Sequence, residues 1–182
     1  MSSLTIELPT QQSQTRFNLA RWAEVLADPN LNKVEGRVET DRHGYIIMSP
    51  PPAANHGFFQ GEVYFVLRSL MPNGRVSTEC PISTADGVRA ADVAWASPEC
   101  LEKLGGRVCF PISPEICVEV VSPSNSDMEI EQKMALYFDA GAQEVWLCSD
   151  KGKIQFFEGT GQEMPSSRLC PQFPNVVKLA GP

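Results

Sequence analysis

Four ionisable residues have the types and spacing that metal-assisted chemistry needs. Glu119 interrupts the apolar run ICVEVV, and Asp92 interrupts the similar run VRAADVAWA. A lone carboxylate in a buried strand is costly unless it forms an ion pair or binds a metal. Glu35 stands at the entry of an expected hairpin, and Lys133 stands one helical turn before Tyr137, so Lys133 and Tyr137 share a helix face.

The chemistry that these residues suit is hydrolysis of phosphate esters. Carboxylates on adjacent strands are good ligands for Mg²⁺ or Mn²⁺, because hard cations prefer oxygen. Water held by such an ion can become a nucleophile, and a nearby ammonium can stabilise the charge that develops on a phosphate. Without a metal, Glu35, Asp92 and Glu119 are expected to repel one another and to raise one another's pKa values.

Each candidate also has a structural interpretation. Glu119 could form a buried ion pair, as buried acids often do. Lys133 could pair with Glu129, which stands four residues earlier on the same helix. Glu35 could be a surface acid at the hairpin entry. His56 could simply belong to the first turn of a helix, and Tyr137 could be a core residue.

The bulk properties narrow the class of protein. The chain has 182 residues, enough for one domain with a hydrophobic core, and we expect a single domain over residues 1–182. No apolar run approaches the ~20 residues needed to span a bilayer, and the N-terminus does not resemble a signal peptide. We therefore expect a cytoplasmic protein that does not enter a membrane.

Cysteine content and charge exclude further classes. The six cysteines form no CxxC pair and only two histidines are present, which disfavours a structural zinc site. Reduced, buried thiols are the simplest interpretation. The net charge of −7 argues against strong non-specific binding of nucleic acid. It is compatible with a local basic groove, or with a metal that neutralises clustered acids.

The first half of the chain predicts helices around a hairpin. Residues 1–17 are polar without clear periodicity and are expected to form a loose N-terminal arm. Asn18 is a candidate cap for a short helix over 19–28. Strands at 36–40 and 45–49 form the expected hairpin.

The middle of the chain predicts a helix followed by strands. Helical spacing of apolar residues marks a helix within 53–71, and strands are expected at 74–80 and 88–96. A short helix is expected at 97–104. The nearly continuous apolar run at 115–122 is typical of a central strand that is buried on both faces.

The last part of the chain completes an α/β pattern. Ser126 and Glu129 have the spacing of a capping box, so a helix should begin there, and Gly141 is a natural stop. Strands are expected at 144–149 and 153–159. This order of elements predicts an α/β protein with a mixed β-sheet flanked by helices.

These segments resemble the putative restriction endonuclease family (Uma-type), long catalogued as a domain of unknown function within the PD-(D/E)XK nuclease superfamily. The matching stretches are EGRVE…GYIIMSPPPAANH, RAADVAWAS, PEICVEVVSPSNSD and EQKMALYFDAGAQEVWLCS. They run from about Glu35 to Ser149. EVVSPS, followed by K-x-x-x-Y and AG-x-x-E-x-W, is specific as a set. The resemblance implies a restriction-endonuclease-like fold and a Mg²⁺- or Mn²⁺-dependent hydrolase that acts on DNA.

The resemblance also implies a role for each acid. Asp92 fills the acid position of "PD", and Glu119 fills the acid position of "(D/E)XK". The backbone carbonyl of Val120 would assist them in holding the metal. The lysine position of the motif holds Val121, which cannot act, and the resemblance places the lysine on the following helix at Lys133.

The same resemblance assigns roles to Glu35 and His56, and Tyr137 is a further candidate. Glu35 matches an N-terminal acid that approaches the metal, and His56 matches a recurrent histidine at the start of the second helix. The hydroxyl of Tyr137 is expected near the metal ligands. Ala91 stands where a proline would complete "PD", but the carboxylate that follows is kept.

Two functions follow, and they belong to different classes. The first is a metal-dependent DNA endonuclease that hydrolyses phosphodiester bonds. A homodimer would suit that activity, since cutting both strands usually calls for two active sites. The second is a catalytically weak or inactive nuclease-fold module that binds DNA or another protein, which Val121 and the acidic net charge favour. A sugar- or nucleotide-phosphate enzyme is disfavoured, because no GxxxxGK[ST] loop occurs.

Overall fold

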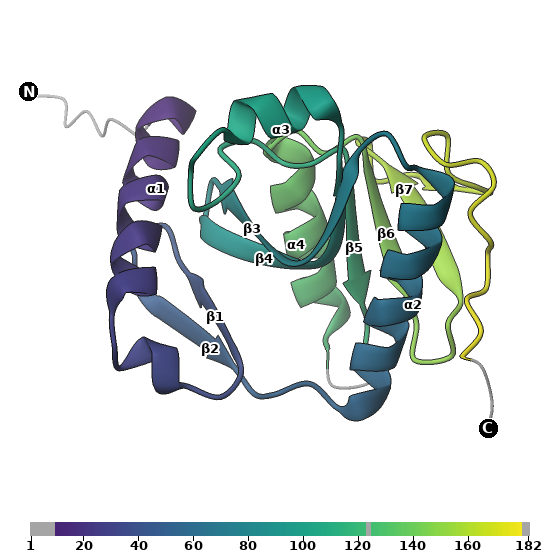
Figure 1. Cartoon of the computed structure of the whole chain (residues 1–182), viewed down its shortest axis with the longest axis horizontal. Coiled ribbons are helices and arrows are strands. Elements are labelled where there is room, and N and C mark those ends of the chain that lie inside the picture. Colours follow the sequence, from purple (N-terminus) through teal and green to yellow (C-terminus); the bar gives the residue numbers. More distant parts are fainter. Residues whose placement is uncertain (1–9, 123–124, 180–182) are drawn as a thin grey trace, which may run out of the picture.

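The computed structural model describes residues 10–122 and 125–179. Its elements are, in chain order, α1 (Gln11–Ala27), the 3-10 turn η1 (Leu31–Lys33), β1 (Arg37–Thr40), β2 (Ile46–Ser49), α2 (Ala54–Leu70), β3 (Arg75–Thr84), β4 (Gly87–Ala96), α3 (Pro98–Leu104), β5 (Ile116–Val120), α4 (Asp127–Asp139), β6 (Glu144–Cys148), β7 (Ile154–Glu158) and β8 (Glu163–Met164). A six-stranded sheet has the order β3-β4-β5-β6-β7-β8, and β1 and β2 form a separate hairpin. Helix α2 covers one face of the sheet and α4 the other (Figure 1). The predicted mixed sheet flanked by helices is confirmed.

Strand β5 is the central element for the site, and all five of its residues are buried. It pairs antiparallel with β4 and parallel with β6, to which α4 connects it. Its apolar run suits a strand that is covered on both faces, as predicted. Because side chains alternate across a strand, Val118 and Val120 pack on the α2 side, whereas Cys117 and Glu119 face α4.

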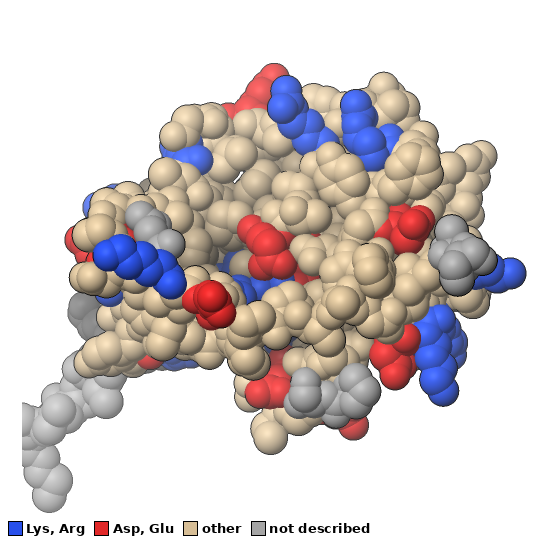
Figure 2. Space-filling view, turned by 60° about the horizontal axis from the view of Figure 1, so that its bottom comes forward, with Lys and Arg blue, Asp and Glu red and all other residues tan. Residues whose placement is uncertain are grey.

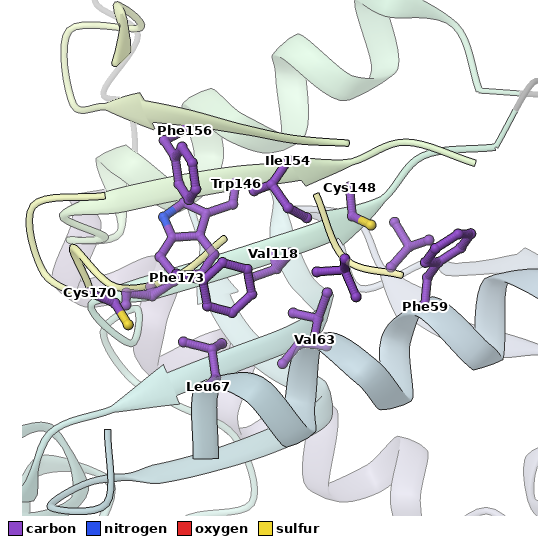
Figure 3. Packing of buried hydrophobic residues seen from close by; sticks show 14 of the residues in the cluster. Phe59, Val63, Leu67, Val118, Trp146, Cys148, Ile154, Phe156, Cys170 and Phe173 are labelled. Carbon is purple, nitrogen blue, oxygen red and sulfur yellow. The ribbon is translucent and has the colours of Figure 1, made fainter. Parts of the chain in front are cut away.

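Two apolar clusters hold the helices to the sheet. On one face, Phe59, Val63 and Leu67 of α2 pack against the sheet and the C-terminal segment (Figure 3). The rings of Trp146 and Phe173 lie 4.6 Å apart in this cluster. The α4 face carries a second cluster in which small side chains of β4 and β5 leave room for the helix. Large rings thus fill the α2 face, whereas the strands carry smaller side chains where α4 packs.

The N-terminal region differs from the prediction of a loose arm over residues 1–17. Helix α1 begins seven residues earlier than Asn18, and Thr10 caps it by accepting a hydrogen bond from the Ser13 N–H at 3.2 Å. Asn18 is buried within α1, and its amide donates to the β3–β4 hairpin. The proposed Asn18 cap is therefore wrong, because a tertiary contact uses the side chain. Residues 1–9 lie outside the described part of the chain.

Most other elements follow the sequence pattern. Ser126 and Glu129 form the predicted capping box at the start of α4, and α2 and α3 lie within the predicted ranges. All six cysteines are free and buried. Among the described residues, no helix is long and apolar enough to cross a membrane.

Candidate active site

The site is a cleft of about 1630 Å³. It is lined by the β1–β2 hairpin, the sheet, the N-terminal part of α2 and one side of α4. Figure 2 shows acidic and basic side chains gathered around a hollow near the middle of one face. Tyr137 is buried against Glu119. Glu35 is exposed and is not among the described residues that line the cleft. The predicted site residues that do line it are Asp92, Glu119, Val120, Lys133 and His56.

Asp92 and Glu119 lie opposite each other on neighbouring strands. Val93 of β4 pairs with Val118 of β5 in antiparallel register, and the next residues outward are Asp92 and Glu119. Directly opposed residues of antiparallel strands carry their side chains on the same face. The N–H of Val120 donates to Asp92 Oδ2 at 2.6 Å, so the Asp92 carboxylate reaches the end of β5.

The Asp92 carboxylate is 1% exposed and is balanced by cations. The Arg37 guanidinium donates to its Oδ1, and His56 Nε2 lies 3.3 Å from the same atom. Burial alone would raise the pKa of Asp92, but His56 and Arg37 outweigh burial and lower the pKa to about 2. The predicted rise of the Asp92 pKa by repulsion between acids is therefore wrong.

The contact between His56 and Asp92 is electrostatic in character. His56 Nε2 is buried and lies 3.3 Å from Asp92 Oδ1 without a hydrogen bond to that atom. The neighbouring carboxylate of Asp92 raises the pKa of His56, against the opposing effects of burial and Arg37. The contact with Asp92 therefore favours the protonated form of His56 at the start of α2.

Glu119 has a different environment from Asp92. Tyr137 donates to Glu119 Oε1 at 2.7 Å, and Lys133 Nζ lies 3.1 Å from Oε2. Burial raises the pKa of Glu119 to about 7, and the charge of Asp92 adds to this rise, whereas Lys133 opposes it. The predicted rise of the Glu119 pKa is confirmed, although burial contributes more than repulsion.

Lys133 points into the site rather than along its helix. Its ammonium contacts Glu119 at 3.1 Å and Glu39 Oε1 at 3.6 Å. Burial lowers the pKa of Lys133, but the carboxylates of Glu119 and Glu39 outweigh burial and raise the pKa, so the side chain is an ammonium. The alternative pair with Glu129 does not form, because the Glu129 carboxylate accepts the backbone N–H of Ser126.

Glu39 is an acid of the site that the sequence did not single out. It is buried, and its Oε1 accepts the Ala90 N–H at 2.8 Å, in a part of β4 that extends beyond its pairing with β5. A signal was present in the predicted strand GRVET: Arg37 and Glu39 are two residues apart, so they lie on one face of β1. Glu39 thus occupies the region expected for Glu35.

Arg37 joins the site to strand β3. Its Nε and Nη2 bind both carboxylate oxygens of Glu79 at 2.8 and 2.9 Å, while it also donates to Asp92. Gln60 Nε2 bridges Glu79 Oε1 and the Asp92 carbonyl at 3.0 and 2.8 Å. Glu79 has a φ of 49°, a left-handed conformation that non-glycine residues rarely adopt. No local sequence signal pointed to this group.

Comparisons with known proteins identify the family of the chain. Residues 22–179 match the sequence pattern of Uma2, a family described as putative restriction endonuclease. The chain belongs to this family. The resemblance seen in the sequence is therefore confirmed over most of its length.

A solved structure has the same fold as this Uma2-family chain. It is the crystal structure of a putative nuclease belonging to DUF820 from Anabaena variabilis, with a TM-score of 0.68 and 19% sequence identity. The similarity covers 85% of this chain and 93% of that chain. No curated protein matches the sequence.

The donor set of this Uma2-family chain suits a hard cation with few protein ligands. No group of three or more His, Cys, Asp or Glu side chains in the described residues is arranged to hold a metal. Asp92 and Glu119 nevertheless direct two carboxylates to one cleft, beside Val120 at the end of β5. Mg²⁺ commonly binds through one or two carboxylates and keeps several waters. The pair fits such an ion, which would replace protein cations as the counter-charge.

Proposed function

We propose that this chain is a Mg²⁺- or Mn²⁺-dependent endonuclease that hydrolyses phosphodiester bonds of DNA. The position of Lys133 carries the proposal: its ammonium lies 3.1 Å from Glu119, in the cleft that Asp92 also lines. Val121, directly after β5, occupies the usual position of the lysine, and α4 supplies an ammonium from another element. Membership of a family described as putative restriction endonuclease supports the same reaction class.

Each residue of the site would have a distinct role in hydrolysis. The carboxylates of Asp92 and Glu119 and the carbonyl of Val120 would hold the ion. When bound, the ion would supply positive charge at the phosphate and lower the pKa of water. Lys133 would donate to a phosphate oxygen or orient the attacking water. Tyr137 would keep the Glu119 carboxylate in position through its 2.7 Å hydrogen bond.

We assign the accessory acidic role to Glu39 in place of Glu35. Glu39 lies 3.6 Å from Lys133 and lines the cleft, so it can orient the ammonium. His56 would add positive charge beside Asp92. Its distance of 3.3 Å from Asp92 Oδ1 makes it a residue that acts through the carboxylate.

A nuclease-fold module without useful catalysis is the second candidate, and the charges of the cleft favour it. Protein cations already balance Asp92 and Glu119. Two further cleft cations, Arg42 and Arg89, are paired with Asp86. Together with the net charge of −7, this pairing leaves little basic surface in the cleft for a phosphate backbone.

Plasmid cleavage separates the two candidates. Supercoiled DNA would be incubated with the wild type, Asp92→Asn and Lys133→Met in Mg²⁺, in Mn²⁺ and in EDTA. We expect metal-dependent nicking that Asp92→Asn abolishes and that Lys133→Met slows by at least ~100-fold. The matched control Lys151→Met, on an exposed turn, should change the rate by less than about twofold.

Each outcome decides between the candidates. Equal cleavage by Asp92→Asn would contradict the role of Asp92 as a metal ligand, and no cleavage by a folded wild type would favour the binding module. Linear product that appears without accumulation of the nicked form would support two sites acting together. Sedimentation of the same sample would then test the homodimer that we propose for concerted cleavage.

A further inference from the structure

Arg37 and a metal ion would compete for one carboxylate. The Arg37 guanidinium is bound to Asp92, whose side chain is 1% exposed. Our proposed function assigns the same carboxylate to Mg²⁺ or Mn²⁺, and the present inference rests on that assignment. A buried, ionised carboxylate needs a counter-charge in every state of the protein. His56 contributes at 3.3 Å from Oδ1, and either the guanidinium or the metal must provide the rest.

The structure gives the guanidinium a second place to bind. Glu79 holds Arg37 through two hydrogen bonds, of 2.8 and 2.9 Å, a geometry that is strong and directional. Arg37 also donates to the Ala90 carbonyl at 3.2 Å. Gln60 fixes Glu79 Oε1 from α2 at 3.0 Å. If the Asp92 carboxylate bound a metal instead, Arg37 would still be held by Glu79 and the Ala90 carbonyl.

We propose that Arg37 is an internal counter-ion that competes with the divalent metal for Asp92, and that Glu79 retains the guanidinium when the metal binds. In the metal-free protein Arg37 stabilises the Asp92 charge. It lowers metal affinity by the free energy needed to displace it from that carboxylate. Arg37 is thus a positioning residue that sets the metal concentration at which the site fills.

Mn²⁺ binding, measured by the electron paramagnetic resonance of the free ion, tests the competition without relying on activity. Arg37→Met removes the competing charge and keeps an unbranched stem, so we expect about tenfold tighter binding. Arg42→Met removes the same charge from a cleft residue that pairs with Asp86. It should change affinity by less than about threefold. Asp92→Asn should abolish binding.

A double-mutant cycle distinguishes competition from a general change in charge. Glu79→Gln removes the second place for the guanidinium, so Arg37 should remain on Asp92 and Mn²⁺ should bind about fivefold more weakly. In the Arg37→Met background the same Glu79→Gln change should have little effect. A purely electrostatic role would weaken binding equally in both backgrounds.

The possible results separate this inference from the function on which it rests. Wild-type binding that Arg37→Met leaves unchanged or weakens would overturn the competition while leaving the metal site standing. Equal effects of Glu79→Gln in both backgrounds would also overturn it. A folded wild type that binds no Mn²⁺ at all would overturn the proposed metal chemistry and the competition together.

Discussion

Two buried glutamates on neighbouring parallel strands have opposite surroundings. Glu144, at the start of β6, is 2% exposed, and three N–H groups of β6 and the C-terminal segment donate to its carboxylate at 2.7 to 2.9 Å. Glu119, near the C-terminal end of β5, accepts hydrogen bonds from a tyrosine and a lysine of α4 and lines the cleft. The first carboxylate joins chain segments, and the second faces an ammonium that lines the cleft.

The comparison teaches that the kind of partner, rather than burial, marks a functional acid. Both glutamates stand in apolar strands, ICVEV and EVWLC, and both need compensation. The donors to Glu144 are the backbone N–H groups of Arg168 and Leu169 and the buried indole of Trp146, all of which the fold holds in place. A lysine side chain on the wall of an open cleft can change partner. Of these two glutamates, Glu119 is therefore the one that we propose exchanges its counter-charge for a metal.

The largest expected effect concerns the rate of cleavage. Glu119→Gln keeps the shape of the side chain but removes the charge of a metal ligand, so cleavage should fall by at least about a thousandfold. Glu144→Gln makes the same chemical change away from the cleft, and the folded protein should cleave at the wild-type rate. Initial rates on plasmid DNA, normalised to folded protein, test the pair. An equal loss of cleavage rate in both variants would show that the two glutamates do not differ in function.

The next effect concerns stability. Glu144→Ala leaves three buried N–H groups without their acceptor, so the free energy of unfolding should fall by about 4 kcal/mol. Urea denaturation at a temperature where the variant is folded measures this loss. A variant that keeps wild-type stability and loses cleavage would show that Glu144 belongs to the active site.

A third effect concerns pH in metal-free buffer. The pKa of Glu119 is raised to about 7 in the folded protein, so the folded state holds this proton more tightly than the unfolded chain. The resulting stabilisation is complete below the unfolded value of 4.5 and is lost as the pH rises through about 7. Asp92, with a pKa of about 2, stays ionised in this range.

Denaturation in EDTA across this range measures the loss. The wild-type free energy of unfolding should fall by on the order of 3 kcal/mol between pH 4.5 and about 8. Glu119→Gln should show a much flatter profile. A wild-type profile that rises with pH would mean that Lys133 outweighs burial and that Glu119 is ionised throughout.

The smallest effect concerns the hydroxyl of Tyr137. Tyr137→Phe removes the 2.7 Å hydrogen bond to Glu119, which costs about 1 kcal/mol of stability near neutral pH. This hydrogen bond lowers the pKa of Glu119, so its loss should move the midpoint of the pH profile upward. An unchanged midpoint would show that the hydroxyl supports packing alone.

Local signals predicted the elements that carry the site. An apolar run with one acid identified β5, and the spacing of Ser126 and Glu129 located the start of α4. The same local reasoning failed for α1, where Asn18 has the chemistry of a cap but is buried against β3–β4. It also offered Glu129 as a partner for Lys133, whereas the buried Glu119 is the partner that forms.

The sequence by itself determined which strands contain a charge that must be compensated, and its motifs identified the family. Hydrogen bonds within helices and hairpins are local, so spacing and capping carry that information. Only the tertiary structure decided the partners of each charge. Arg37 and Glu39 come from β1, Gln60 from α2 and Lys133 from α4, and the sheet register and helix packing bring these three elements together. Because counter-charges act over a few ångströms in space, their choice is made by the fold rather than by neighbours along the chain.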